Sequence, residues 1–228
     1  MIEILFLDLD DTILDFHKAE YIAIGKTLAL FGLDPTEEVR ARYSQINKEH
    51  WERLERKELT REQVKVNRFG MLFREYGIKA DSQECARRYM ENLAQGHYFL
   101  PGAQEAGMGL SKKYKLYLVS NGTADVQFSR LNSAGIGAYF QQIFISEQVG
   151  ADKPDPVFFS RCFEKIPGFE KKKALIVGDS LTSDMLGGKN AGIDTCWVNP
   201  RKKPVREDIP VTYQIGALSE LEDLLEAL

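Results

Sequence analysis

Short apolar segments that stop at polar or small residues constrain this chain most. They are residues 2–7, 114–119, 142–145, 174–177 and 195–198. Nearly continuous apolar runs of this length are typical of strands that are buried on both faces of a parallel sheet. Helical patterns follow most of them, so the sequence predicts an α/β fold. Ligands bind beyond the carboxyl ends of such strands, which makes the polar stops the candidate functional positions.

A long helical insertion separates the first two predicted strands. The first ends at Leu7 and the second begins at Tyr114, much farther apart than the ~30 residues that a simple crossover needs. Apolar residues between them recur at helical spacing, and a structureless loop of this length would be unusual. We therefore predict three segments: a core segment at 1–15, a helical domain at 16–100, and the rest of the α/β core at 101–228.

Composition excludes several classes of protein. The chain has 228 residues, with 30 Lys plus Arg and 34 Asp plus Glu, and a formal net charge of −4. This mild acidity argues against a nucleic-acid-binding protein, and no segment is long and apolar enough to span a membrane. The segment that starts at Met1 lacks the basic region of a secretory leader. Three widely spaced cysteines predict buried thiols and not disulfides, so we expect a cytoplasmic protein.

Two acidic motifs follow predicted strands. In Asp8-Leu9-Asp10-Asp11-Thr12, Asp8 and Asp10 are two positions apart, so both carboxylates can point the same way. Asp179 and Asp184 follow the fourth apolar segment and add oxygen ligands. Burying this much like charge is costly unless a cation or proton offsets it, and Mg²⁺ prefers oxygen ligands. Each motif alone is also compatible with an Asx turn or a helix N-cap.

Two further polar segments complete the pattern. Ser120-Asn121-Gly122 ends the second strand, where a hydroxyl followed by backbone N–H groups can cradle an anion. An ordinary turn would explain these three residues equally well. Lys153 lies in a Lys-Pro-Asp-Pro segment that two prolines stiffen. A lone lysine in a loop is usually solvated, so Lys153 gains meaning only from the motifs around it.

Taken in their order along the chain, from Asp8 through Ser120 and Lys153 to Asp179, the four motifs resemble those of the haloacid dehalogenase-like hydrolases. The resemblance covers the whole chain, because the insertion lies where that superfamily places its type-1 helical cap. It implies a Rossmann-like parallel sheet flanked by helices, with an inserted α-helical cap domain. Residues 145–150, 187–192 and 195–199 further resemble the superfamily's bacterial pyrimidine 5′-nucleotidases. The cap residues that resemble this group are Asn47, Trp51 and Arg68.

The resemblance assigns the acidic residues to a two-step phosphate transfer. Asp8 would attack phosphorus and form an aspartyl-phosphate, which water then hydrolyses. Asp10 would protonate the leaving oxygen and then activate that water. Mg²⁺ would bind through Asp8, the backbone carbonyl of Asp10, and Asp179, with Asp184 close by. The dehalogenases of the superfamily lack a carboxylate at the second acidic position, so Asp10 favours phosphate chemistry.

The remaining motif residues would hold the phosphate group. Ser120 with the amides of Asn121 and Gly122, together with Lys153, would bind the oxygens that do not react. Phosphomutases share these motifs, and so do phosphatases for sugar phosphates or phosphoglycolate. A non-catalytic phosphate-binding module on the same fold is a further alternative.

The implied partner is a small phosphorylated metabolite, foremost a nucleoside monophosphate. Asn47, Trp51 and Arg68 would contact it from the cap, although Trp51 could instead pack between cap helices. We expect neither nucleic acid nor a membrane as a partner, and a monomer or a homodimer.

Overall fold

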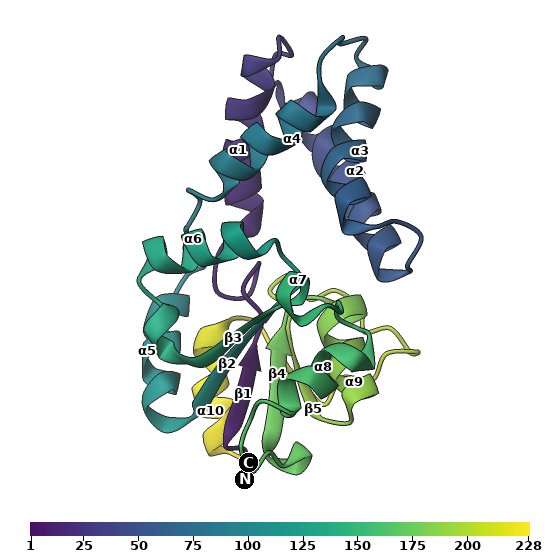
Figure 1. The fold of residues 1–228 in the computed structure, drawn as a ribbon. Helices are drawn as coiled ribbons and strands as arrows, with labels where there is room; N and C mark the ends of the chain where they lie inside the picture. Colours follow the sequence, from purple (N-terminus) through teal and green to yellow (C-terminus); the bar gives the residue numbers. More distant parts are fainter. The chain divides into compact units, whose positions relative to one another are not determined.

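A six-stranded parallel sheet forms the core of the first of two units (Figure 1). The computed structural model describes all 228 residues; Met1–Asp15 and His97–Leu228 form this unit, and Phe16–Gly96 form the second. The sheet order is β3-β2-β1-β4-β5-β6. The strands are β1 (Ile4–Leu7), β2 (Lys115–Ser120), β3 (Phe140–Ile145), β4 (Ala174–Gly178), β5 (Asp194–Val198) and β6 (Tyr213–Ile215). The predicted α/β fold is confirmed.

Alternation along β1 explains why its sequence is apolar throughout. Leu5 and Leu7 face one apolar layer, whereas Ile4 and Phe6 face the layer on the other side of the sheet. All four side chains are buried, because β1 lies between β2 and β4 and helices cover both faces. In the second layer the Phe6 ring meets the Phe159 ring edge-on at 6.0 Å.

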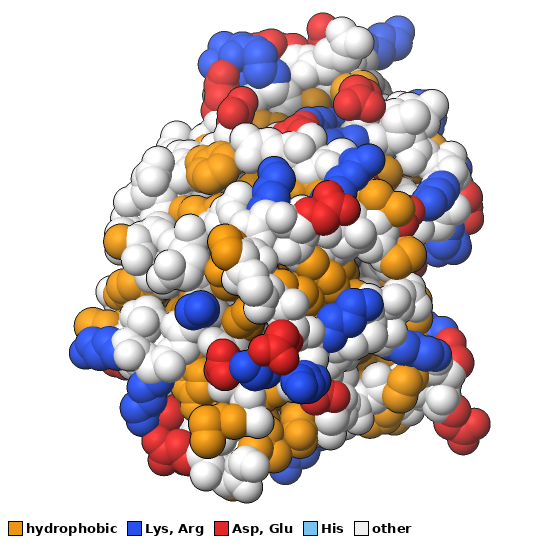
Figure 2. All heavy atoms as spheres, turned by 60° about the horizontal axis from the view of Figure 1, so that its bottom comes forward, with side chains coloured by type: hydrophobic (Ala, Val, Ile, Leu, Met, Phe, Trp, Pro, Cys, Tyr) orange, Lys and Arg blue, Asp and Glu red, His pale blue; other side chains and the backbone are white.

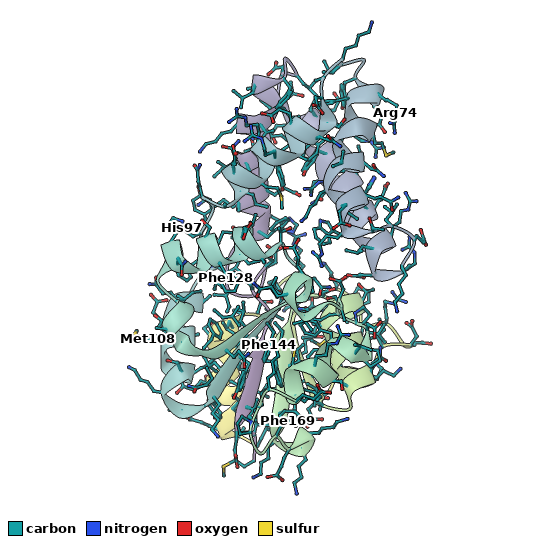
Figure 3. The ribbon with its side chains drawn as sticks, in the orientation of Figure 1. Arg74, His97, Met108, Phe128, Phe144 and Phe169 are labelled. Carbon is teal, nitrogen blue, oxygen red and sulfur yellow. The ribbon has the colours of Figure 1, made fainter.

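Helices on each face complete these layers. The first layer receives side chains from α5 (Ala103–Lys113), α6 (Ala124–Ala134) and α10 (Leu221–Glu226). The second layer packs on α8 (Pro156–Phe163) and α9 (Leu186–Ala191), with Phe144 of β3 inside it (Figure 3). A short helix, α7 (Ser146–Val149), follows β3 directly. Short turns of 3₁₀ helix lie at Gly137–Tyr139, Lys171–Lys173 and Leu218–Glu220.

The second unit is a group of four helices. They are α1 (Phe16–Leu30), α2 (Glu37–Glu55), α3 (Arg61–Glu75) and α4 (Ser82–Leu93). Helix α1 packs against α4, and α2 packs against α3 (Figure 1). Local sequence sets where α3 begins: the Thr60 hydroxyl accepts from the Gln63 backbone, and the Gln63 side chain accepts from the Thr60 backbone. This capping box satisfies N–H groups that the helix itself leaves unpaired.

The five predicted strands are confirmed, and β6 is an addition. Tyr213–Ile215 has three residues with a polar one in the middle, which is too short a pattern to stand out from a loop. The three cysteines are buried free thiols, as predicted. None of the helices combines the length and the apolar character of a membrane span. Figure 2 shows acidic and basic side chains interspersed over the face it presents.

Truncating Leu5 tests the central position of β1. Leu5 is fully buried, so Leu5→Ala should lower the free energy of unfolding by about 2–5 kcal/mol through lost burial and the cavity left behind. Met108 projects from α5 and is 43% exposed (Figure 3), so Met108→Ala should change the free energy by less than ~0.5 kcal/mol. Urea denaturation measures both variants. Equal losses would contradict this description of the core.

Candidate active site

Three polar motifs meet at the carboxyl edge of the sheet because their strands are direct neighbours. Asp8 follows the last residue of β1, Ser120 is the last residue of β2, and Asp179 follows the last residue of β4. β1 pairs with both β2 and β4 in parallel register. The Asp8 backbone N–H continues the pairing with β4 by donating to the Val177 carbonyl at 2.9 Å.

A tight turn after β1 presents the second acidic residue. The Leu9 carbonyl accepts from the backbone N–H groups of both Ile13 and Leu14. Asp11 has a φ of +56°, a left-handed conformation that aspartate tolerates better than most residues. The turn therefore fixes the backbone of Asp10 between a buried strand and a closed loop.

Lys153 is buried between two carboxylates. Its Nζ lies 2.7 Å from Asp8 Oδ1 and 2.6 Å from Asp184 Oδ1, and it donates to the Val119 carbonyl at 2.9 Å. Burial alone disfavours its charge, but Asp184 and Asp8 outweigh this effect and raise the pKa of Lys153. The ammonium group is therefore a fixed positive charge beside Asp8.

A reciprocal pair of hydrogen bonds holds the Lys153 loop on β2. The Asn121 side chain donates to the Lys153 carbonyl at 2.8 Å and accepts from the Lys153 backbone N–H at 2.9 Å. Asn121 therefore sets the position of the lysine, in addition to the anion-binding role predicted for its backbone.

Three carboxylates gather around this lysine. Single oxygens of Asp8, Asp179 and Asp184 lie within 4.8 Å of one another. Burial, with Lys153 opposing it, raises the pKa of Asp8 to about 8. Burial, and then the charges of Asp184 and Asp8, raise the pKa of Asp179 well above its usual value. One ammonium cannot balance three carboxylates, and an all-oxygen donor set suits a hard divalent cation, so these residues fit Mg²⁺.

A glycine and an unusual turn bring Asp184 to the cluster. Residues Leu181–Met185 form a π-helical turn, and the Asp184 carboxylate accepts from the Ser180 backbone N–H at 3.1 Å. A Cβ built on Gly178 would lie 2.2 Å from Asp184 Oδ2. Only glycine leaves room for the carboxylate there, which explains the glycine before Asp179.

The Asp10 carboxylate lies outside the three-carboxylate cluster. Its oxygens accept instead from Gln127 and Arg130, two residues of α6 that the sequence analysis did not single out. The available signal was two polar residues one helical turn apart on the buried side of α6, next to Val126 and Leu131. The metal-binding role of the Asp10 backbone carbonyl stays a prediction.

Ser120 is buried at the end of β2. Its hydroxyl accepts from the Gly122 backbone N–H at 3.1 Å and from the Gln127 side chain at 2.8 Å. Ser120 and Gly122 thus lie close together where β2 ends and the short loop to α6 begins. Their binding of phosphate oxygens stays a prediction.

Two of the three predicted cap residues lie in a buried polar network inside the helical unit. Asn47 donates to Glu20 at 2.6 Å and accepts from Arg68 at 2.5 Å. Asn47 and Arg68 are almost fully buried, and the guanidinium of Arg68 lies over the Tyr89 ring at 4.8 Å. Trp51 is half-buried on α2, with the Arg61 guanidinium over its ring at 5.5 Å. The substrate contacts predicted for these residues stay predictions.

Known proteins are similar to this chain over nearly its whole length. The sequence model of the haloacid dehalogenase-like hydrolases matches residues 4–198. YfnB of Bacillus subtilis is 40% identical over 221 residues, covering 97% of this chain and 94% of YfnB. Its magnesium-bound crystal structure matches with a TM-score of 0.94 and 39% identity and covers 98% of both chains. The pyrimidine 5′-nucleotidase PynA of Streptococcus pneumoniae is 38% identical over 223 residues, covering 97% of this chain and 94% of PynA.

A more distant relative is also a pyrimidine 5′-nucleotidase. The pyrimidine 5′-nucleotidase YjjG of Escherichia coli is 29% identical over 221 residues, covering 97% of this chain and 96% of YjjG.

The parallel sheet, its acidic carboxyl edge and the helical insertion after β1 define a class of hydrolases with an inserted cap. The chain belongs to the haloacid dehalogenase-like hydrolase family. The resemblance seen in the sequence motifs is thereby confirmed.

Gly178→Ala tests the placement of Asp184. The added methyl would displace the Asp184 carboxylate, so the affinity for Mg²⁺ should fall by roughly 10- to 100-fold, as when a ligand's support is removed. Gly137 has open space around its Cβ position, and Gly137→Ala is the matched control. Isothermal titration with Mg²⁺ measures both. Unchanged affinity in Gly178→Ala would show that Asp184 does not contribute to the metal site.

Proposed function

We propose that this protein is a Mg²⁺-dependent phosphomonoester hydrolase that acts on pyrimidine nucleoside 5′-monophosphates. The observation that carries the proposal is Asp8, held against Lys153 at 2.7 Å, beside Asp179 and Asp184 at the carboxyl edge of the sheet. Two full-length relatives that are pyrimidine 5′-nucleotidases support the substrate class.

Asp8 is the proposed nucleophile. One of its oxygens forms a bond to phosphorus as the bond from phosphorus to the ester oxygen breaks, which leaves an aspartyl-phosphate. Asp10 gives a proton to the departing oxygen, so the nucleoside leaves as a neutral alcohol. Asp10 then takes a proton from water as that water attacks phosphorus, and phosphate and free Asp8 result.

Positive charge and hydrogen-bond donors serve the other phosphate oxygens. Lys153 supplies a compact cation, and Ser120 with the amides that follow it supplies donors. Asp8, Asp179 and Asp184 would hold Mg²⁺, which when bound offsets the repulsion between a carboxylate and a phosphate dianion. The carboxylate of Asp10 favours this chemistry over dehalogenation, because a halide leaves without a proton.

We assign the preference for the base to the helical unit. The proposed residues are Asn47, Trp51 and Arg68. An aromatic face such as that of Trp51 suits stacking on a base, and the amide of Asn47 is fixed from both sides by Glu20 and Arg68. A rigid amide can discriminate between donor and acceptor patterns, because its hydrogen-bonding groups cannot turn to suit the wrong base.

A substrate panel tests the substrate class. Phosphate release with Mg²⁺ is measured for UMP, dUMP, dTMP, AMP, phosphoglycolate, sugar phosphates and p-nitrophenyl phosphate. We expect kcat/KM for the pyrimidine monophosphates to exceed that for AMP by at least ~10-fold, about 1.4 kcal/mol of differential binding in the transition state. Equal rates for all esters would support a phosphatase activity but refute the assignment as a nucleotidase. Transfer of phosphate within a sugar phosphate would indicate a mutase.

Asp8→Asn tests the nucleophile. An amide does not attack phosphorus, so turnover of UMP should fall at least ~10³-fold while the fold persists. Asp223→Asn makes the same chemical change at an exposed position of α10 and should leave the rate unchanged. Phosphate release and circular dichroism are measured for both variants. Substantial activity in Asp8→Asn would refute the proposed mechanism, whereas wild-type protein inactive on every ester would favour a binding module.

A further inference from the structure

Helix α6 carries two buried polar side chains that its apolar environment does not explain. Gln127 and Arg130 are 1% and 0% exposed, and they lie three positions apart, on one side of the helix. Long polar side chains are rarely buried to this extent without a partner. Their partners therefore indicate what the two residues are for.

Both side chains reach Asp10. Gln127 Nε2 donates to Asp10 Oδ2 at 2.7 Å, and Arg130 Nη1 donates to Asp10 Oδ1. Arg130 Nη1 also donates to Gln127 Oε1 at 2.9 Å, so the two donors brace each other. Each oxygen of the Asp10 carboxylate is thus held by a separate side chain of α6. Since a carboxylate has about four acceptor positions, two donors leave room for a substrate oxygen or a water.

Gln127 connects this carboxylate to the loop after β2. The same Nε2 that contacts Asp10 lies 2.8 Å from Ser120 Oγ. A Cβ on Gly122 would lie 2.4 Å from Nε2, so the glycine gives the amide its place. One side chain therefore spans the distance between the proposed proton donor and the proposed phosphate-binding hydroxyl.

Helix α6 is itself firmly anchored. At its N-terminus the Ala124 backbone N–H donates to a Glu147 carboxylate oxygen at 2.8 Å. An acidic group at this end also favours the helix dipole. Leu131, next to Arg130, packs into the first apolar layer, which contains Leu5 and Leu7. The side chains of Gln127 and Arg130 are consequently held in place by a helix that is fixed at its N-terminus and on its apolar side.

We propose that Gln127 and Arg130 are positioning residues that orient the Asp10 carboxylate for proton transfer. The inference rests on the proposed function. In the first step an Asp10 oxygen gives its proton to the ester oxygen as the bond from phosphorus to that oxygen breaks and Asp8 bonds to phosphorus. In the second step Asp10 takes a proton from the attacking water, and the bond between Asp8 and phosphorus breaks. Both steps need one carboxylate in one orientation.

The size of the expected effect follows from general acid catalysis. A positioned acid contributes typically ~10²–10⁴-fold to a rate, and a small displacement of a catalytic group can cost ~10²-fold. The contribution depends on the leaving group, because nitrophenolate departs without a proton and a nucleoside does not. Loss of orientation at Asp10 should therefore harm UMP and spare p-nitrophenyl phosphate, whereas general damage to the site would harm both.

The test compares kcat/KM for the two esters, since this parameter reports the step in which the leaving group departs. For Arg130→Met we expect a loss of roughly 10- to 100-fold with UMP and less than ~3-fold with p-nitrophenyl phosphate. Gln127→Ala also removes the hydrogen bond to Ser120, which serves both esters, so we expect some loss with both and a clearly larger loss with UMP. Arg130→Lys keeps a charged donor and should recover part of the loss. Asn132→Ala, at an exposed position of α6, is the matched control and should resemble wild type.

A double-variant cycle shows whether the pair acts through Asp10. In an Asp10→Asn background, Arg130→Met should have little further effect on UMP, and Gln127→Ala a smaller effect than in wild type, because the group they orient is gone. Equal losses for the two esters, additive losses in the cycle, or full activity of folded variants would each overturn the inference. If Arg130→Met does not fold, Gln127→Ala and Arg130→Lys decide the question. Wild-type protein that hydrolyses neither ester would instead refute the proposed function.

Discussion

The burial of like charge at one edge of the sheet is the constraint on which the rest of the site depends. Asp8, Asp179 and Asp184 bring oxygens within 4.8 Å of one another, and a single buried ammonium, that of Lys153, lies among them. Replacing a buried ion pair by apolar residues is often neutral or stabilising, so such a cluster is poor evidence of a contribution to stability. Burial raises the pKa values of Asp8 and Asp179, which shows that holding their charges away from water is unfavourable. A site of this kind is best understood as prepared for a cation.

The fold supplies the site through strand order. β1 lies between β2 and β4, so the segments that follow these three strands converge, although they are far apart along the chain. Rigid layers on both faces fix the strand ends. Precise features are then added locally: Gly178 leaves room for Asp184, Asn121 fixes the Lys153 loop, and α6 presents donors to Asp10. The carboxylates of Asp8, Asp10 and Asp184 are each held by a side chain from another segment.

The helical unit has its own buried polar network. Glu20, Asn47 and Arg68 come from three different helices, α1, α2 and α3, and join through hydrogen bonds. Burial raises the pKa of Glu20. Hydrogen bonds from Ser44 and Asn47 and the charge of Arg68 lower it and so offset part of this increase. A network of this kind fixes the relative register of the helices. It gives the helical unit a rigid polar interior.

Sequence alone determined five of the six parallel strands and the candidate motif residues, because burial on both faces leaves a local apolar pattern and the polar residues at strand ends stand out against it. It also indicated the helical insertion, through periodicity and length. Pairings between distant segments leave no such local pattern. The contact of Lys153 with Asp8 and Asp184, and the hold of Gln127 and Arg130 on Asp10, join residues that the chain separates widely. Only the tertiary structure decided these contacts, because strand order and the placement of α6 determine which side chains meet.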